Sequence, residues 1–492
     1  MPDIRYVCLS DMHLGAQNSL LTNLGADAVT PEPLQASPPL KALVDCLAAL
    51  IGHNEQPSIK PELILNGDIL ELAVASDEIA VMAFERFVQL ALDEHDLFDR
   101  TIHYLPGNHD HHLWETARER QYAEYIARHE AGSPVEPPWH ATHLFPAYDQ
   151  DQRQKRRVEA ELLNAVVRRF PRLHDVTVEV HYPTFGLRSR EGGVVAFHHG
   201  HYAESIYRLM SRLKVALFPG SQTGPEAWDW EAENFAWIDF FWSTLGRSGT
   251  WGADVGLLYD MLQDERALQA VGRNLADSVS AMKSRTVPRF ARRWTARAVI
   301  RHIANRVGSL ERSRSADSRP QLDSPVQLTP AGIRGLSELV EGPLAQQIAA
   351  DCGGVPEQVS FVFGHTHKPY ETRCAYAGYP RAVDVYNTGG WVVDTLQPEV
   401  QQGAAAVLID ENLHVATLRI YNQQRNHDST PVRISAPTAS PFLDRIRSLV
   451  HPDEEPWAGL SRAVSVAAPQ RSAGLQAIIE SGIANARSRS ST

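Results

Sequence analysis

The chain has 492 residues, of which 43% are hydrophobic, and its 47 basic and 59 acidic side chains give a formal net charge of −12. This length corresponds to roughly two to four domains' worth of material, and the negative charge argues against a protein that binds polyanions over its whole surface. The four cysteines are scattered and form no Cys-x-x-Cys pair, which excludes a zinc ribbon or redox pair of that kind.

The sequence predicts no membrane span and no export signal. Its most hydrophobic window, Phe235 to Trp242, is interrupted by Asp239 and is much shorter than the ~18 apolar residues that a span requires. The first predicted strand begins at Ile4, close behind Met1, which leaves no room for a cleavable signal peptide. We therefore expect the protein to be cytoplasmic, without a transmembrane segment.

Short apolar runs in the chain predict buried strands, and each is followed at once by a polar block. The runs are Ile4 to Leu9, Leu63 to Leu65, Ile102 to Leu105, Val194 to Phe197 and Val359 to Phe363. Helices are predicted near Pro39 to Ile51 and Ile79 to Leu92, which gives βαβ spacing in the first part of the chain. Strand ends in layered α/β folds are where sites collect.

The remaining elements suggest a core that is split by insertions. Strands are predicted at Val383 to Tyr386, Val407 to Ile409 and Val415 to Ile420, and short helices at Phe442 to Val450 and Leu475 to Ala486. We predict the following division: first half of the core, 1–130; first insertion, 131–190; core strand and metal loop, 191–204; mainly helical cap insertion, 205–350; second half of the core, 351–425; and a partly flexible C-terminal extension, 426–492.

A basic stretch lies in the predicted cap. Residues 283–314 contain ten Lys or Arg and one acid, Glu311. This stretch could contact a second phosphate, a nucleic-acid backbone or an anionic lipid surface. The alternative is a solvated helix face paired with the acidic segment Glu226 to Glu233. Neither interpretation identifies a substrate.

The polar blocks carry the residue types that hold metal ions. Asp11 and His13 are two apart in an extended segment, so both can reach one ion. Asp68 follows a glycine and can approach two ions, whereas Asn108 offers a neutral oxygen ligand. Each block alone could be a strand-end turn or a surface histidine. The five blocks are Asp11 to His13, Gly67 to Asp68, Gly107 to Asp110, His198 to His201 and Gly364 to His367. Because they occur in this order, each at a strand end, together they predict a site for two metals.

The ordered blocks resemble the calcineurin-like metallophosphoesterase superfamily, whose pattern runs D-x-H, G-D, G-N-H-[D/E], H and G-H-x-H. The resemblance implies an α/β fold, a four-layer αββα sandwich with mainly helical cap insertions and two metal ions at one edge. It assigns one ion to Asp11, His13, Asp68 and His367. It assigns the other ion to Asp68, Asn108, His199 and His365.

The same resemblance gives the remaining roles. Asp68 would bridge the two ions, His109 would protonate the leaving oxygen or stabilise the transition state, and Asp110 would hold the ring of His109. In the fourth block His199 directly precedes glycine and is the favoured ligand, with His201 as the alternative. The ligands suit two divalent ions, with Mn²⁺ expected and Fe or Zn as alternatives.

The implied function is hydrolysis of a phosphodiester or pyrophosphate bond by metal-activated water. The alternatives are a phosphomonoesterase, a nuclease, or a catalytically silent interaction scaffold. The stretch from Gly67 to Glu71 and the basic segment after His201 also look like the UDP-diacylglucosamine pyrophosphatases of lipid A synthesis. This chain differs in carrying His109 where those enzymes typically have Arg, and in its longer cap.

Overall fold

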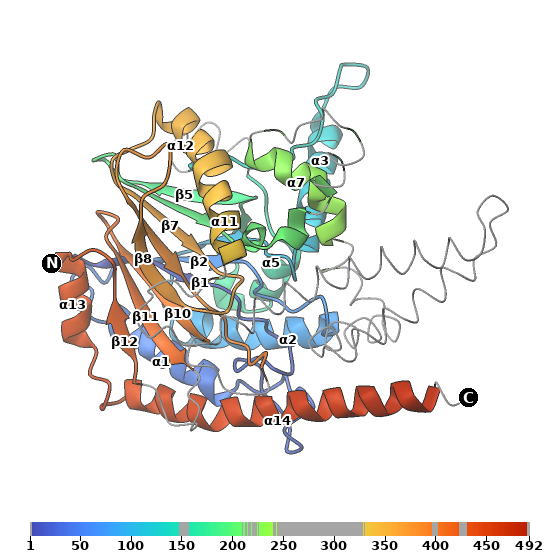
Figure 1. Ribbon diagram of the computed structural model, residues 1–492, viewed down its shortest axis with the longest axis vertical. Helices are drawn as coiled ribbons and strands as arrows, with labels where there is room; N and C mark the ends of the chain where they lie inside the picture. The colour runs from blue at the N-terminus through green and yellow to red at the C-terminus, as the bar shows by residue number, and fades with distance from the viewer. Residues whose placement is uncertain are drawn as a thin grey trace.

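The computed structural model describes residues 2–146, 157–208, 226–239, 330–395, 402–422 and 431–489, with isolated positions at 210, 211, 214, 218, 224, 243 and 328. These residues form two β-sheets that are flanked by helices (Figure 1). The predicted α/β class is confirmed, and the two sheets with helices on their outer faces agree with the predicted αββα sandwich. The basic stretch 283–314 lies outside the described residues.

The larger sheet has seven strands. Their order is β12 (Arg433–Ser435), β11 (Val415–Asn422), β10 (Gly403–Asp410), β1 (Ile4–Leu9), β2 (Glu62–Asn66), β3 (Thr101–Leu105) and β4 (Thr177–Val180). Strands β1 to β4 run parallel to one another, so their carboxyl ends share one edge. Strands β10 to β12 extend the sheet in antiparallel fashion from β1.

The smaller sheet has five strands. Their order is β5 (Thr184–Arg188), β6 (Val194–His198), β7 (Val359–Phe363), β9 (Val383–Asn387) and β8 (Tyr370–Cys374). The central strands β6, β7 and β9 are parallel. Strands β6 and β7 pair directly although much of the predicted cap separates them in sequence. The proposed division into core and insertions remains a prediction.

Helices cover the outer face of each sheet (Figure 1). Those on the larger sheet are α1 (Pro38–Ile51), α2 (Asp77–Val88), α5 (Glu161–Val167), α13 (Pro441–Leu449) and α14 (Trp457–Arg489). Those on the smaller sheet are α11 (Pro330–Leu339) and α12 (Ala345–Cys352). The other helical segments are η1 (Gln89–Glu94), α3 (His112–Arg128), η3 (Pro171–Leu173), η4 (His201–Ala203), η5 (Ser205–Arg208), α7 (Ala227–Ile238) and η8 (Val340–Leu344).

Alternation along the strands builds the core between the sheets. In β6, Val194 and Ala196 face the outer helices, whereas Val195 and Phe197 face the other sheet. Strand β2 does the same, with Ile64 facing inward. Among the described residues, no helix is long and apolar enough to cross a bilayer.

Replacing Phe197 with Ala should test this packing. The ring is fully buried between the sheets, so its removal leaves a cavity and should lower the free energy of unfolding by about 3–5 kcal/mol. Urea denaturation measures the change. The control is Leu34→Ala, whose side chain is 69% exposed and whose loss should change stability by less than about 0.5 kcal/mol. Equal effects of both substitutions would contradict the described core.

Candidate metal centre

The predicted metal-binding blocks meet at the carboxyl ends of the parallel strands. Among the described residues, eight non-glycine positions have a positive φ, and five of them are predicted ligands. These five are Asp11, His13, Asp68, His365 and His367, with φ values between 44° and 66°. A left-handed backbone is unfavourable for most residues and concentrates at functional sites. The strain therefore falls on the residues that the sequence predicts as ligands.

Two glycines allow the blocks to approach closely. Gly67 has φ 88°, and a Cβ atom added there would clash with the ring of His199. A Cβ atom at Gly364 would clash with the carboxylate of Asp11. Only glycine permits this approach without displacing a predicted ligand.

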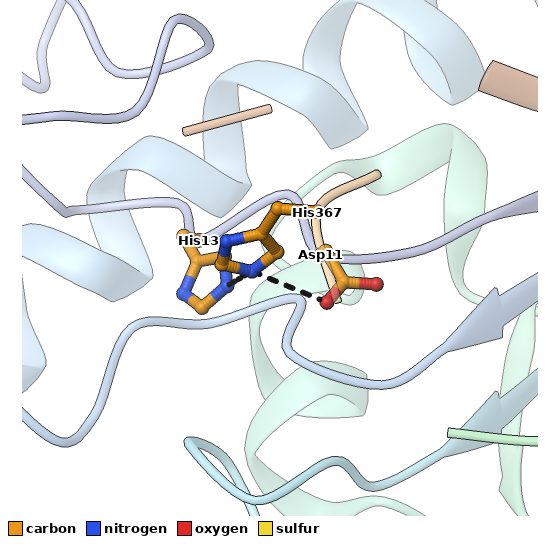
Figure 2. Close-up of side chains that lie close together, drawn as sticks. All are labelled: Asp11, His13 and His367. Atoms are coloured by element: carbon orange, nitrogen blue, oxygen red, sulfur yellow. Dashed lines mark hydrogen bonds and ion pairs between the residues drawn. The ribbon is translucent and has the colours of Figure 1, made fainter. Parts of the chain in front are cut away.

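The first donor set is Asp11, His13 and His367, which Figure 2 shows pointing toward one another. The Nε2 atoms of His13 and His367 are 3.2 Å apart, and Nε2 of His367 is 3.5 Å from Oδ1 of Asp11. Asp11 and His13 are buried, and His367 is mostly so. Three potential ligand atoms from the loops after β1 and β7 thus converge on one point.

Hydrogen bonds on the far side of each ring set the direction of these nitrogen lone pairs. Nδ1 of His13 is 2.8 Å from Oε2 of Glu71, and Nδ1 of His367 is 2.9 Å from Oδ2 of Asp394. An ionised carboxylate can only accept, so each Nδ1 donates a proton and Nε2 is the atom with which each ring would bind a metal. The two Nε2 atoms, 3.2 Å apart beside Asp11, can share a proton or bind one cation between them. This donor set therefore fits a metal ion.

The second donor set is built around Asn108. Its Oδ1 atom lies 3.1 Å from Nε2 of His199 and 2.9 Å from Nδ1 of His365. Nδ1 of His199 is 3.2 Å from the carbonyl oxygen of Asn66, which leaves its Nε2 lone pair directed into the site. These side chains are buried, and together with Asp68 they offer the mixed oxygen and nitrogen ligands that divalent transition metals accept.

Asp68 lies between the two sets. Its Oδ2 atom is 3.1 Å from Nε2 of His199 and 3.8 Å from Nε2 of His13. Its Oδ1 atom accepts a hydrogen bond of 2.7 Å from the backbone N–H of His109. Because Oδ1 is engaged in this way, the single atom Oδ2 faces both donor sets.

The electrostatics of the site favour positive charge. Burial opposes ionisation of Asp68, but His199, His109 and His13 outweigh it and hold its pKa well below the usual value. Burial also disfavours imidazolium, yet Asp68 raises the pKa of His199 to about 9. Asp11 and Asp394 outweigh burial in the same way and raise the pKa of His367 to about 10. A divalent ion would compete with these protons for the same lone pairs.

The predicted partner of His109 is corrected. Nδ1 of His109 is 2.9 Å from Oε1 of Glu71, and the pKa of His109 is raised to about 9 because Glu71 and Asp68 outweigh the effect of burial. The carboxylate of Asp110 instead accepts backbone N–H groups, at 2.7 Å from Gly107 and 2.8 Å from Ile69. Asp110 therefore ties together the loops after β2 and β3, and Glu71 holds the ring.

Glu71→Gln should separate the charge of this carboxylate from its shape. Glu71 contacts both His13 and His109. Loss of its charge should therefore weaken the orientation of the predicted ligand His13 and of the predicted acid His109. We expect turnover to fall by roughly 10–100-fold, the scale for groups that orient a metal ligand. Steady-state hydrolysis of bis-p-nitrophenyl phosphate with Mn²⁺ measures the loss. Wild-type turnover in Glu71→Gln would contradict a role of Glu71 in orienting His13 and His109.

The structure separates His199 from its histidine neighbours. His199 faces Asp68, whereas Nε2 of His201 lies 3.6 Å from Oε1 of Glu231 on α7. Nδ1 of His198 accepts a 2.8 Å hydrogen bond from the N–H of Gly200, and its Nε2 lies 3.7 Å from Oε1 of Glu231. We therefore place His199 in the second donor set, with His201 in the contact between the core and α7.

Sequence reasoning missed several of these partners. Glu71, three residues after Asp68, was noticed only as part of a likeness to other enzymes, and no spacing pattern connects Asp394 or Glu231 to the ligand blocks. Nδ1 of His365 faces Asn108, while its Nε2 lies 3.6 Å from Oε1 of Glu204. Glu71, Asp394 and Glu204 lie beside predicted ligand histidines, where carboxylates commonly orient the imidazole. Glu231 instead lies beside His198 and His201.

Comparisons with known proteins add little. A scan against protein-family models finds no match, and neither does a search of curated proteins. Among solved structures, the chain is similar to a dimetal phosphatase from Danio rerio, with 11% sequence identity and a TM-score of 0.30, over 89% of this chain and 100% of that chain. A similarity at this level carries no argument about activity, so the interpretation rests on the geometry of the site.

Proposed function

We propose that this protein is a metal-dependent phosphoesterase that uses two divalent ions to hydrolyse a phosphodiester or pyrophosphate bond with water. The observation that carries this proposal is the position of Asp68, whose Oδ2 atom faces both donor sets. When bound, two divalent ions lower the pKa of water and offset the charge that develops on the phosphoryl oxygens. The two donor sets by themselves support metal binding, whatever the substrate.

The residues divide the work as follows. Asp11, His13, Asp68 and His367 would hold one ion, and Asp68, Asn108, His199 and His365 the other. His109 would donate a proton to the leaving oxygen, with Glu71 fixing its Nδ1 atom. Asp110 would keep the Asp68 and Asn108 loops in register through its backbone hydrogen bonds. No side chain needs to act as a nucleophile.

The proposal also covers the metal, the substrate class, the partners and the location. Mn²⁺ is the favoured ion, although the same ligands accept Fe and Zn. The candidate substrate classes are nucleotide diphosphate esters, phospholipids and nucleic acids. The likeness to UDP-diacylglucosamine pyrophosphatases supports the first of these. Contact of the basic stretch 283–314 with anionic lipid or nucleic acid, and a cytoplasmic location, remain predictions.

Hydrolysis of bis-p-nitrophenyl phosphate and p-nitrophenyl phosphate tests the proposal. The full chain is stripped with a chelator and assayed before and after adding Mn²⁺. We expect metal-dependent cleavage with preference for the diester. Preference for the monoester would favour a phosphomonoesterase. Full activity toward either ester after complete metal removal would contradict the metal-dependent mechanism.

A further inference from the structure

Asp394 is a fixed carboxylate behind a predicted ligand. Its Oδ2 atom accepts a 2.9 Å hydrogen bond from Nδ1 of His367, and the side-chain amide of Gln402 donates to its Oδ1 atom. Gln402 is buried, and its own amide oxygen accepts a 2.9 Å hydrogen bond from the hydroxyl of Thr395. The carboxylate therefore has a set orientation.

Both imidazoles of the first donor set are supported in this way. Glu71 holds Nδ1 of His13 at 2.8 Å, as Asp394 holds Nδ1 of His367. A carboxylate behind an imidazole fixes its tautomer and makes the coordinating nitrogen more basic. With Asp11 and Asp68, four carboxylates act on this position.

The second donor set has weaker support. Behind His199 is the neutral carbonyl oxygen of Asn66, at 3.2 Å. Behind His365 the nearest carboxylate oxygen, on Glu204, is 3.6 Å from Nε2, beyond hydrogen-bonding distance. Asn108 is neutral, so Asp68 supplies the only carboxylate among the predicted ligands of this set.

We propose that the two ion sites are unequal: the Asp11–His13–His367 site binds its ion more tightly, and Asp394 is a positioning residue that sustains this difference. The inference rests on the proposed dinuclear function and deepens it. The tighter ion would stay bound while the other exchanges. Asp394 is not among the predicted ligands and would act on the ion through the imidazole of His367.

Isothermal titration of Mn²⁺ into the chelator-stripped full chain tests this inference directly. We expect two binding events of different affinity in the wild type. Asp394→Asn keeps the shape of the side chain but removes its charge, and should weaken the tighter event by about 10–100-fold while leaving the weaker event unchanged. Gln402→Ala, which leaves the carboxylate in place but loosens it, should weaken the same event by a smaller factor.

Further variants assign the events and provide the control. His367→Ala should remove the tighter event, and His365→Ala the weaker one. Asp444→Asn alters an exposed carboxylate on α13 and should match the wild type. Two events of equal affinity, or an Asp394→Asn effect on the weaker event alone, would overturn the inference but leave the dinuclear proposal intact. Absence of Mn²⁺ binding by the wild type would overturn both.

Discussion

Asp68→Asn is expected to reduce hydrolysis by about 10³-fold, the upper end of the range for removing one electrostatic group from an active site. The reason is that Oδ2 of Asp68 faces the ligands of both proposed ions, at 3.1 Å from His199 and 3.8 Å from His13. Asparagine keeps the size of the side chain but removes the negative charge that would lie between two cations. Steady-state rates on bis-p-nitrophenyl phosphate with Mn²⁺ measure the loss.

The controls separate this effect from unfolding. Asp444→Asn makes the same chemical change at a side chain that is 76% exposed and should retain wild-type activity. Circular dichroism should show that Asp68→Asn keeps its secondary structure. A folded Asp68→Asn protein with wild-type turnover at the same Mn²⁺ concentration would show that Asp68 does not serve both ions.

His109→Ala is expected to reduce turnover by about 10²–10⁴-fold, the usual contribution of a general acid. The loss should depend on the leaving group. It should be larger for diphenyl phosphate than for bis-p-nitrophenyl phosphate, because p-nitrophenolate is a weak base and needs little protonation. Metal binding should be retained, because the side chain of His109 is not among the proposed ligands.

Two outcomes would contradict the role of His109. An equal loss on both diesters would indicate that its ring stabilises the transition state without protonating the leaving oxygen. A loss of bound metal equal to that in Asp68→Asn would indicate that it helps to hold an ion. Metal content and rates measured on the same preparations distinguish these results.

The strands and the ligand positions could be predicted because each depends on a local pattern. The run from Leu63 to Leu65 is apolar with the β-branched Ile64 at its centre, and the structure extends it by one residue at each end to form β2. The polar block then follows at the strand end, where parallel strands share an edge. Order and spacing indicate that the blocks meet at one edge of the sheet, whereas the grouping of their side chains into two sets is what the resemblance to calcineurin-like metallophosphoesterases implies.

The carboxylates behind the ligands could not be predicted, because the loop conformation decides which side chain is near which. Asp110 is the sequence neighbour of His109, yet it accepts hydrogen bonds from backbone amides of the loops after β2 and β3. Glu71 reaches the ring from another loop. The left-handed conformation of Asp68 and His367, at φ 51° and 54°, has no signature in the pattern of residue types.

Helix α14, at the C-terminal end, was also predicted only in part. The sequence suggested only a short helix after Leu475, whereas the structure has one helix from Trp457 to Arg489 with Pro469 inside it. Its buried positions include Trp457, Leu460 and Val464, which repeat at helical spacing along the face toward α1. Frequent small residues and a proline obscured this period.

Metal content per chain tests the central proposal most directly. The full-length protein is dialysed to equilibrium against Mn²⁺, freed of unbound ion, and analysed by mass spectrometry of its metals alongside Asp68→Asn and Asp444→Asn. We expect close to two ions per chain in the wild type and in Asp444→Asn, and a clear loss in Asp68→Asn. A wild-type protein that retains no ion, or an Asp68→Asn protein that retains both, would contradict a dinuclear centre built around Asp68.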